Sequence, residues 1–259
     1  MKIIRPKISV IMPYFRKKFF FKRSINSVLN QTFKSFEVII IFDDNNLEEL
    51  NYIKNIIKNK KKIKLIINKK NLGAGYSRNV GIKNSRANYV AFMDCDDIWQ
   101  KNKLKLQYKF MLKNNYKLTH TSYNVVDRNE KVIQKNIIKN NIIDYNHLIK
   151  SCDIGLSTVM INRKILKSEK FPNLKTKEDY VLWLKILKRG YKFFGLNKLL
   201  VSWRISDNSL SSNKFQKFLD AFRVYNYYEK NNFFTSVIYT IRLSINALLK
   251  NYRFILNVL

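Results

Sequence analysis

Apolar runs alternate with amphipathic stretches along the first hundred residues of the chain. Short runs rich in Ile, Val and Phe predict strands, and stretches with an apolar side chain every three or four positions predict helices between them. The predicted strands are Ile8–Met12, Glu37–Phe42, Ile63–Ile67 and Tyr89–Met93, with helices around Phe21–Leu29, over about Leu47–Lys58 and after Gly75. This order predicts an α/β fold in which a mostly parallel, doubly wound sheet is flanked by helices.

The middle of the chain mixes the two patterns. The predicted helices are Lys101–Lys113 and Asp179–Lys188, and the predicted strands are Lys117–Tyr123 and Ser157–Ile161. A polar loop is expected at Asp207–Asn213. A length of 259 residues suits one large α/β domain or one such domain with a helical tail.

The last segment, residues 214–259, is predicted to be a basic amphipathic helical tail. From Phe233 onward it is mostly apolar, with a narrow polar stripe at helical spacing formed by Thr235, Tyr239, Arg242, Asn246, Lys250, Arg253 and Asn257. Seven Lys or Arg residues and two acids give the segment a net charge of +5. Two interpretations stay open: the helix lies in an anionic membrane interface, or it packs on the core or on a second subunit.

The whole chain is strongly basic, with 50 Lys and Arg against 18 Asp and Glu and a formal charge of +32. Such a charge favours anionic partners, which include nucleic acid, an anionic membrane surface and phosphorylated substrates. Much of the Lys stands among Asn and Ile, as in Asn59–Lys64, so a general compositional bias explains the charge equally well. Charge alone therefore does not choose the partner.

The sequence also predicts where the protein works. Cys95 and Cys152 lack zinc-site spacing, so reduced thiols in the cytoplasm are expected. The first residues hold no apolar stretch long enough for a signal peptide, and no window of about 18 uncharged apolar residues is present to span a bilayer. We therefore expect a cytoplasmic protein.

Carboxylates follow two of the predicted strands. The apolar run Tyr89–Met93 ends in Asp94-Cys95-Asp96-Asp97, and Asp43-Asp44 follows Phe42. Ligands of open α/β sheets bind outside the carboxyl ends of the strands, so both acidic segments are expected to face one crevice. Clustered carboxylates there can share one divalent cation, whereas the alternative for each short motif is a solvated loop.

The order of these motifs resembles the family 2 glycosyltransferases of the GT-A fold. The matching segments are Ser9–Tyr14, Ser24–Thr32, Asp43-Asp44, Asn71–Gly73, Ser77–Gly81, Phe92–Asp97 and Lys177–Leu184. The resemblance covers roughly residues 7–213 and implies an inverting enzyme that takes a sugar from a nucleotide diphosphate in bacterial surface-polysaccharide synthesis. It divides the chain into a nucleotide-sugar-binding half (1–115), an acceptor-side half of the same domain (116–213) and the tail.

The resemblance also implies roles for the donor-side residues. Asp94 and Asp96 would hold Mn2+ or Mg2+, which neutralises the charge that grows on the leaving diphosphate, and Asp94 would also approach the ribose. Asp43 would accept a hydrogen bond from the base. Pro13 and Tyr14 would border the same pocket, with the tyrosine ring available to stack on a base.

Arg78, Glu178 and Asp179 complete the predicted site. The planar guanidinium of Arg78 suits a phosphate or base contact, although surface arginines are common at helix starts. Inversion needs a base for the acceptor hydroxyl, and Asp179 is the predicted base, with Glu178 orienting the acceptor or Asp179. The alternative for both acids is a simple preference for a helix N-terminus.

Two departures from the family pattern affect the site. Many relatives carry Tyr-Arg-x-His where this chain has Trp203–Ser206, and Ser206 cannot replace imidazole as a strong metal ligand. Phe15-Arg16 stands where relatives often have Tyr-Asn, which weakens the expected base contact. His120 and His147 stand outside any ligand-spaced cluster and are expected to be ordinary surface or core residues.

Together these features predict a glycosyltransferase at the inner face of the cell membrane. Its expected donor is a UDP-sugar, and its expected acceptor is a glycan or lipid-linked glycan hydroxyl. The alternatives are a basic nucleic-acid-binding protein, for which no P-loop or RNA-module signature is found, and an inactive relative that binds the sugar nucleotide without turnover. We expect no nucleic-acid partner, and the retention of Asp43, Asp94, Asp96 and Asp179 argues against an inactive relative.

Overall fold

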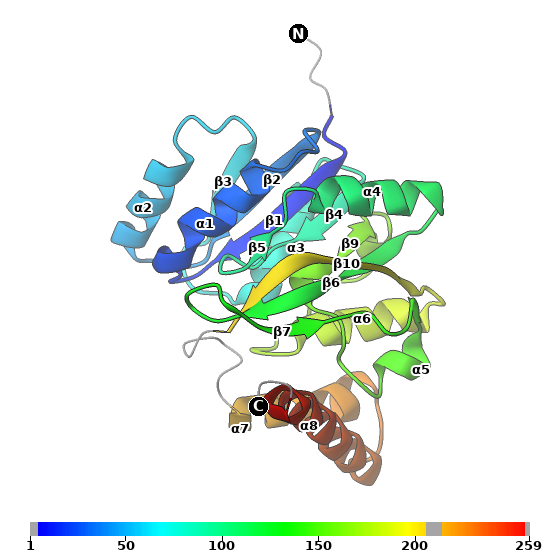
Figure 1. The fold of residues 1–259 in the computed structure, drawn as a ribbon. Helices are drawn as coiled ribbons and strands as arrows, with labels where there is room; N and C mark the ends of the chain where they lie inside the picture. The colour runs from blue at the N-terminus through cyan, green and yellow to red at the C-terminus, as the bar shows by residue number, and fades with distance from the viewer. Residues whose placement is uncertain (1–4, 206–213, 257–259) are drawn as a thin grey trace.

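A ten-stranded sheet with helices on both faces forms the centre of the computed structural model, which describes residues 5–205 and 214–256 (Figure 1). The strand order is β3-β2-β1-β4-β9-β6-β10-β5, with β7 beside β6 and β8 beside β10. The strands are β1 (Ile8–Tyr14), β2 (Phe36–Phe42), β3 (Ile63–Ile67), β4 (Tyr89–Phe92), β5 (Ile98–Trp99), β6 (Leu118–Val126), β7 (Val132–Asn136), β8 (Ile142–Ile143), β9 (Met160–Asn162) and β10 (Phe193–Arg204).

The first four strands in space, β3-β2-β1-β4, are all parallel, which confirms the doubly wound prediction for the first hundred residues. Beyond β4 the sheet is mixed, because β9 runs antiparallel to both β4 and β6 while β6 and β10 are parallel. The sheet therefore continues across both predicted halves of the domain.

The predicted strand Ser157–Ile161 is right only at its end. Residues Leu156–Thr158 form a short 3-10 turn, and the strand begins at Met160. Polar side chains cause the turn, because the Thr158 hydroxyl donates to the Gly155 carbonyl at 2.6 Å, a local bond that competes with strand pairing.

Alternating side chains of the central strands build two hydrophobic cores, one on each face of the sheet. Helices α1 (Lys18–Leu29), α2 (Leu47–Ile57) and α4 (Lys103–Lys113) pack on the face that buries Val10 and Met12. Helices α3 (Ala74–Asn84) and α6 (Glu178–Lys188) pack on the other face, which buries Ile11. Each fully buried aliphatic side chain contributes about 1.5–3 kcal/mol, so these cores fix the edges of the sheet on which the site is built.

The helical tail folds back beside α6 (Figure 1). It consists of α7 (Lys214–Arg223), a π-helical turn (Val224–Tyr228) and α8 (Phe233–Leu256), and the one-turn helix α5 (Tyr145–Leu148) lies near it. The Tyr225 hydroxyl donates to the Ile149 carbonyl at 3.0 Å. Among the described residues, no helix has the length and hydropathy of a membrane span. Ser206 and the predicted loop Asp207–Asn213 lie outside the described residues.

Lys103 gives a testable consequence of this packing. Its side chain is fully buried over the Trp99 ring at 3.8 Å, its Nζ has no hydrogen-bond partner, and burial lowers the pKa of Lys103 well below its ordinary value. Replacing it with Met removes the buried amine, so Lys103→Met is expected to raise the free energy of unfolding by about 1 kcal/mol at pH 7.

This gain should shrink as the pH rises towards 10. The unfolded chain binds a proton at Lys103 that the folded protein holds more weakly, so the wild type gains stability with pH and the variant lacks that gain. Urea unfolding of both proteins at pH 7 and 9.5 checks the prediction, and a variant less stable than the wild type at pH 7 would contradict it.

Candidate active site

The parallel strands bring both acidic segments to one edge of the sheet. Asp43 follows β2 and donates its backbone N–H to the Tyr14 carbonyl at the end of β1, at 2.9 Å. On the other side of β1, the Met93 amide donates to the Ile11 carbonyl at 3.0 Å. The segment that holds Asp94 and Asp96 begins directly after Met93. This shared edge was predicted from the sequence.

Arg78 joins the two most distant parts of the predicted site. It projects from α3, and its guanidinium contacts Asp94 Oδ1 at 2.9 Å and Glu178 Oε1 at 2.5 Å. The Arg78 side chain is only 6% exposed, and its guanidinium carbon lies 5.4 Å from the centre of the Phe171 ring. Burial lowers the pKa of Arg78, but the charges of Asp94 and Glu178 outweigh burial and raise it above its ordinary value.

The approach of α3 to the segment before α6 requires a glycine. A Cβ at Gly75 would meet the Pro172 carbonyl oxygen at 2.8 Å and the Glu178 side chain at 3.3 Å. Because the first distance is shorter than real Cβ contacts, a side chain at Gly75 would push α3 away from Glu178. Gly75 therefore permits the ion pair between Arg78 and Glu178.

Glu178 and Asp179 open α6, as the sequence predicts, and burial shifts both of their titrations. Burial raises the pKa of Glu178 to about 7, against the opposing charge of Arg78. Burial also raises the pKa of Asp179, which is partly exposed and accepts the Tyr180 amide at 2.8 Å. A carboxylate with a raised pKa is a stronger base than an ordinary aspartate.

The two predicted metal ligands each carry a cationic partner. Asp94 Oδ1 pairs with Arg78, and Asp96 Oδ2 pairs with Lys17 Nζ at 3.0 Å. Burial raises the pKa of Asp96, Lys17 opposes that shift and Asp94 adds to it. The two positive charges thus compensate acids that would otherwise repel each other.

These donors fit a hard divalent ion with few protein ligands. Oxygen ligands suit Mn2+ or Mg2+, and Asp94 remains 32% exposed at the edge. Within residues 5–205 and 214–256, no group of three or more His, Cys, Asp or Glu side chains could hold a metal ion. Asp94 and Asp96 are the residues of this edge that could hold such an ion, and their role as ligands stays a prediction.

Arg204 locks the acidic loop in place. It is buried at the end of β10, its Nε donates to the Asp96 carbonyl at 2.9 Å, and its backbone N–H donates to Asp97 Oδ1 at 3.0 Å. Its guanidinium also reaches Glu130 at 2.9 Å and lies 4.6 Å from the Phe20 ring centre. Asp97 therefore holds the loop from inside, as an acid behind the two predicted ligands.

Asp43 is engaged by the loop that leads into α3. Its carboxylate accepts the Asn68 side-chain amide at 2.8 Å, the Leu72 amide at 2.9 Å and the Gly73 amide at 2.8 Å. Gly73 has φ +89°, a conformation that favours glycine. In the structure, Asp43 thus fixes the start of α3, and its contact with a base stays a prediction.

The expectation for the Tyr14 ring needs correction. Tyr14 is fully buried, with its ring packed against Phe21 and Phe42 and its hydroxyl bonded to Glu49. Its position at the end of a strand that is buried on both faces turns the ring into the core, so the ring is not presented for stacking on a base. Pro13, the residue before it, is partly exposed.

Three contributors to the site were not singled out from the sequence. The Ser157 hydroxyl accepts the Asp94 amide at 3.0 Å, Lys17 pairs with Asp96, and Arg204 holds the acidic loop. Arg204 stands in a segment that resembles the family pattern, which is a usable signal. No sequence signal distinguishes Lys17, because it is one of 50 Lys and Arg residues.

The two histidines behave as expected of residues outside the site. His120 is buried, and burial lowers its pKa to about 4, which keeps it neutral. His147 is partly exposed on α5, at 3.5 Å from Asp153.

Fold and site together define an α/β protein with paired carboxylates and a buried arginine at the carboxyl ends of parallel strands, the edge where open α/β sheets bind ligands. Comparison with protein families matches residues 9–170 to the family described as "Glycosyl transferase family 2". TuaG of Bacillus subtilis, a protein assigned to teichuronic acid biosynthesis, is 30% identical over 246 residues, which are 95% of this chain and 98% of TuaG.

The chain therefore belongs to glycosyl transferase family 2 and is a glycosyltransferase with the GT-A fold. WfgD of Escherichia coli, a UDP-Glc:alpha-D-GlcNAc-diphosphoundecaprenol beta-1,3-glucosyltransferase, is 36% identical over 211 residues, 81% of each chain.

Solved structures share the fold at low sequence identity. Residues 1–349 of Staphylococcus aureus TarS, in complex with UDP-GlcNAc, superpose with a TM-score of 0.70 at 22% identity, covering 86% of this chain and 65% of that one. The mannosyltransferase PcManGT of Pyrobaculum calidifontis, in complex with GDP-Man and Mn2+, gives a TM-score of 0.69 at 12% identity, covering 95% and 74%.

The Arg78 bridge predicts a large loss of stability when it is removed. Arg78→Met leaves the carboxylates of Asp94 and Glu178 without their shared cation, and the free energy of unfolding should fall by about 3 kcal/mol. The matched control is Arg86→Met, since Arg86 also pairs with a buried acid, Glu37, at 2.8 Å but is itself 61% exposed. The control should lose about 1 kcal/mol or less. Urea unfolding measures both, and equal losses would show that the bridge adds nothing beyond an ordinary ion pair.

Proposed function

We propose that the chain transfers a sugar, with inversion, from a nucleotide-diphosphate sugar to a hydroxyl of a lipid-linked glycan. One observation carries the proposal: Arg78 contacts both Asp94 of the donor-side motif and Glu178 of the acceptor-side motif. A residue predicted to bind the donor and the acid next to the predicted base therefore meet around one buried cation. An enzyme that joins two substrates needs such proximity.

A UDP-sugar is the proposed donor, and the acceptor is proposed to carry a lipid diphosphate. The name of the similar protein WfgD specifies UDP-Glc and a diphosphoundecaprenol acceptor, and TuaG is assigned to teichuronic acid biosynthesis. These relatives support a role in surface-polysaccharide synthesis. A lipid-linked acceptor would place the enzyme in the cytoplasm at the inner face of the cell membrane.

Mn2+ or Mg2+ is the proposed cofactor, with Asp94 and Asp96 as its protein ligands. The ion would neutralise charge on the leaving diphosphate. The chain's own cations at this edge, Arg78 and Lys17, lie within ion-pair distance of the same two aspartates. Arg78 and Lys17 would therefore add positive charge beside a diphosphate bound at this edge.

Asp179 is the proposed general base. In the transfer, the acceptor oxygen forms a bond to the anomeric carbon as the bond to the diphosphate breaks, and the hydroxyl proton passes to the Asp179 carboxylate. The raised pKa of Asp179 suits this role. Glu178, tied to Arg78 at 2.5 Å, would hold the first turn of α6 in the orientation that the base requires.

The acidic edge gives no support to the alternative of a nucleic-acid-binding protein. Nucleic acid binds to basic surfaces through its phosphates, whereas Asp43, Asp44, Asp94 and Asp96 gather at the carboxyl ends of the strands. If the alternative were right, an Asp94→Asn variant would bind RNA unchanged while no nucleotide bound to the wild type.

Transfer of radiolabelled sugar to a diphospholipid-linked acceptor tests the proposed function. With Mn2+ present, Asp179→Asn should lower kcat by at least about a hundredfold because the base is lost, while UDP binding stays unchanged. The matched control is Glu48→Gln, because Glu48 also stands in the first turn of a helix, α2, but is exposed to solvent and has no predicted role in the site. Equal activity in the two variants would reduce Asp179 to an acid that merely favours a helix N-terminus.

A further inference from the structure

The long helix α8 turns its apolar side chains outward. Phe234, Ile238, Ile241, Ile245 and Leu248 follow one another at helical spacing and are 78%, 64%, 47%, 49% and 64% exposed. An ordinary surface helix buries such a stripe. The apolar stripe of α8 therefore needs an apolar partner from outside the described residues.

The opposite side of α8 meets the protein body mostly through small and polar side chains. Ser236 and Thr240 are fully buried, and the Thr240 hydroxyl donates to the Ser236 carbonyl at 2.7 Å. Leu243 and Tyr239 add the apolar contacts to the core, and the Asn246 side chain donates to the Lys150 carbonyl at 2.9 Å. Of the two interpretations left open by the sequence, packing on the core is seen in the structure, while the apolar stripe of α8 stays uncovered.

Helix α7 and the start of α8 extend this surface. Phe215 and Phe218 of α7 are exposed, as is Phe233, whose ring lies 5.6 Å from that of Phe222. We call the exposed apolar side chains of α7 and α8 the apolar face; its main members are Phe215, Phe218, Phe234, Ile238, Ile241 and Ile245. A contiguous apolar face of this kind marks an interaction surface.

The exposed charges on the tail itself are basic wherever the structure describes the side chains. The two acids of residues 214–256 point inward: Asp220 accepts the Thr176 amide at 3.0 Å, and Glu229 pairs with Lys188 at 2.7 Å with its side chain 2% exposed. The exposed charged residues of this segment, where the structure describes their side chains, are Arg223, Lys230 and Arg242. A surface that combines exposed Phe and Ile with exposed cations complements an anionic membrane interface.

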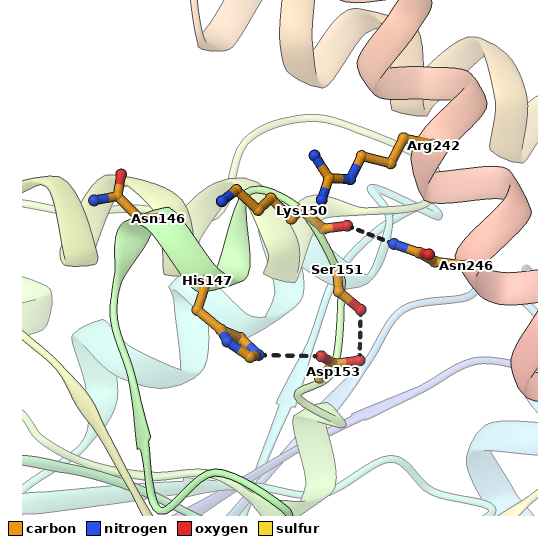
Figure 2. A pocket seen from close by; sticks show the side chains of 7 residues that line it. All are labelled: Asn146, His147, Lys150, Ser151, Asp153, Arg242 and Asn246. Atoms are coloured by element: carbon orange, nitrogen blue, oxygen red, sulfur yellow. Dashed lines mark hydrogen bonds and ion pairs between the residues drawn. The ribbon is translucent and has the colours of Figure 1, made fainter.

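A hollow of about 460 Å³ opens beside the apolar face, between α8 and the segment that follows α5 (Figure 2). Arg242 and Lys150 both line it, Arg242 from α8 and Lys150 from the segment after α5, and the Lys150 side chain extends towards the side of Asn146. Asp153 is engaged there by the Ser151 hydroxyl at 2.7 Å and by His147. Arg242 stands four residues after Ile238 and three before Ile245, so on the helix its side chain is a neighbour of both. A lipid phosphate held by Arg242 and Lys150 would therefore leave its acyl chains beside the apolar stripe.

We propose that the apolar face of α7 and α8 docks on an anionic lipid bilayer, with Arg242 and Lys150 against the lipid phosphates. The inference deepens the membrane location in the proposed function and rests on it for the identity of the acceptor. A second copy of this chain is a poor occupant, because two chains of +32 repel each other. The membrane supplies both the apolar and the anionic complement.

Flotation of the full chain with lipid vesicles tests the docking surface. Vesicles of phosphatidylcholine with phosphatidylglycerol should bind the protein at least tenfold more tightly than phosphatidylcholine alone. The double variant Ile238→Ser with Ile245→Ser should lose at least tenfold in binding, and Arg242→Gln about fivefold. The matched control is Leu47→Ser with Leu112→Ser, two exposed leucines of α2 and α4 on the other face of the sheet, which should bind as the wild type does.

Equal binding to both kinds of vesicle would overturn the proposal, and so would unchanged binding by the Ile238 and Ile245 double variant. Absence of vesicle binding would also overturn it, and a dimer that this double variant dissociates would then identify a second copy of the chain as the partner of the apolar face. Matching thermal midpoints would show that the variants fold. UDP binding to the same proteins, measured without lipid, reports separately on the proposed function, so loss of vesicle binding with intact UDP binding rejects the docking surface alone.

Discussion

A single buried guanidinium holds the two sides of the candidate active site together. Arg78 contacts Asp94 at the end of β4 and Glu178 at the start of α6, two acids that lie 84 residues apart in the sequence. Removing a charge of this size from water costs several kcal/mol, and the two carboxylates and the Phe171 ring offset that cost. The bridge ties the first turn of α6, which carries Asp179, to the end of β4.

The same constraint explains why small residues stand around α3. Gly75 allows the Pro172 carbonyl to approach α3, and Gly81 allows α3 to approach Ile11 of β1, where a Cβ would meet the Ile11 side chain at 2.5 Å. Both close approaches seat α3 between the sheet and the segment that leads into α6. Arg78 thereby reaches both acids without leaving the helix.

Local patterns predicted the part of the fold that local patterns control. Apolar runs and helical spacing located β1 to β4 and α6, and the parallel order then placed Asp43 and Asp94 at one edge. The antiparallel β9, the pairing of Lys17 with Asp96 and the inward turn of Tyr14 depend on contacts between distant segments, which no periodicity encodes. The outward apolar stripe of α8 was visible as a pattern, but only the structure shows which side packs on the core.

The most direct test of this account is a calorimetric titration of UDP into the purified protein with Mn2+ and again with a chelator. We predict binding that requires the metal and that Asp94→Asn abolishes, because Asp94 and Asp96 are the proposed protein ligands of the ion. GDP serves as the comparison for base preference. No binding of either nucleotide, or equal binding with chelator, would contradict the assignment of the acidic edge as a metal-dependent donor site.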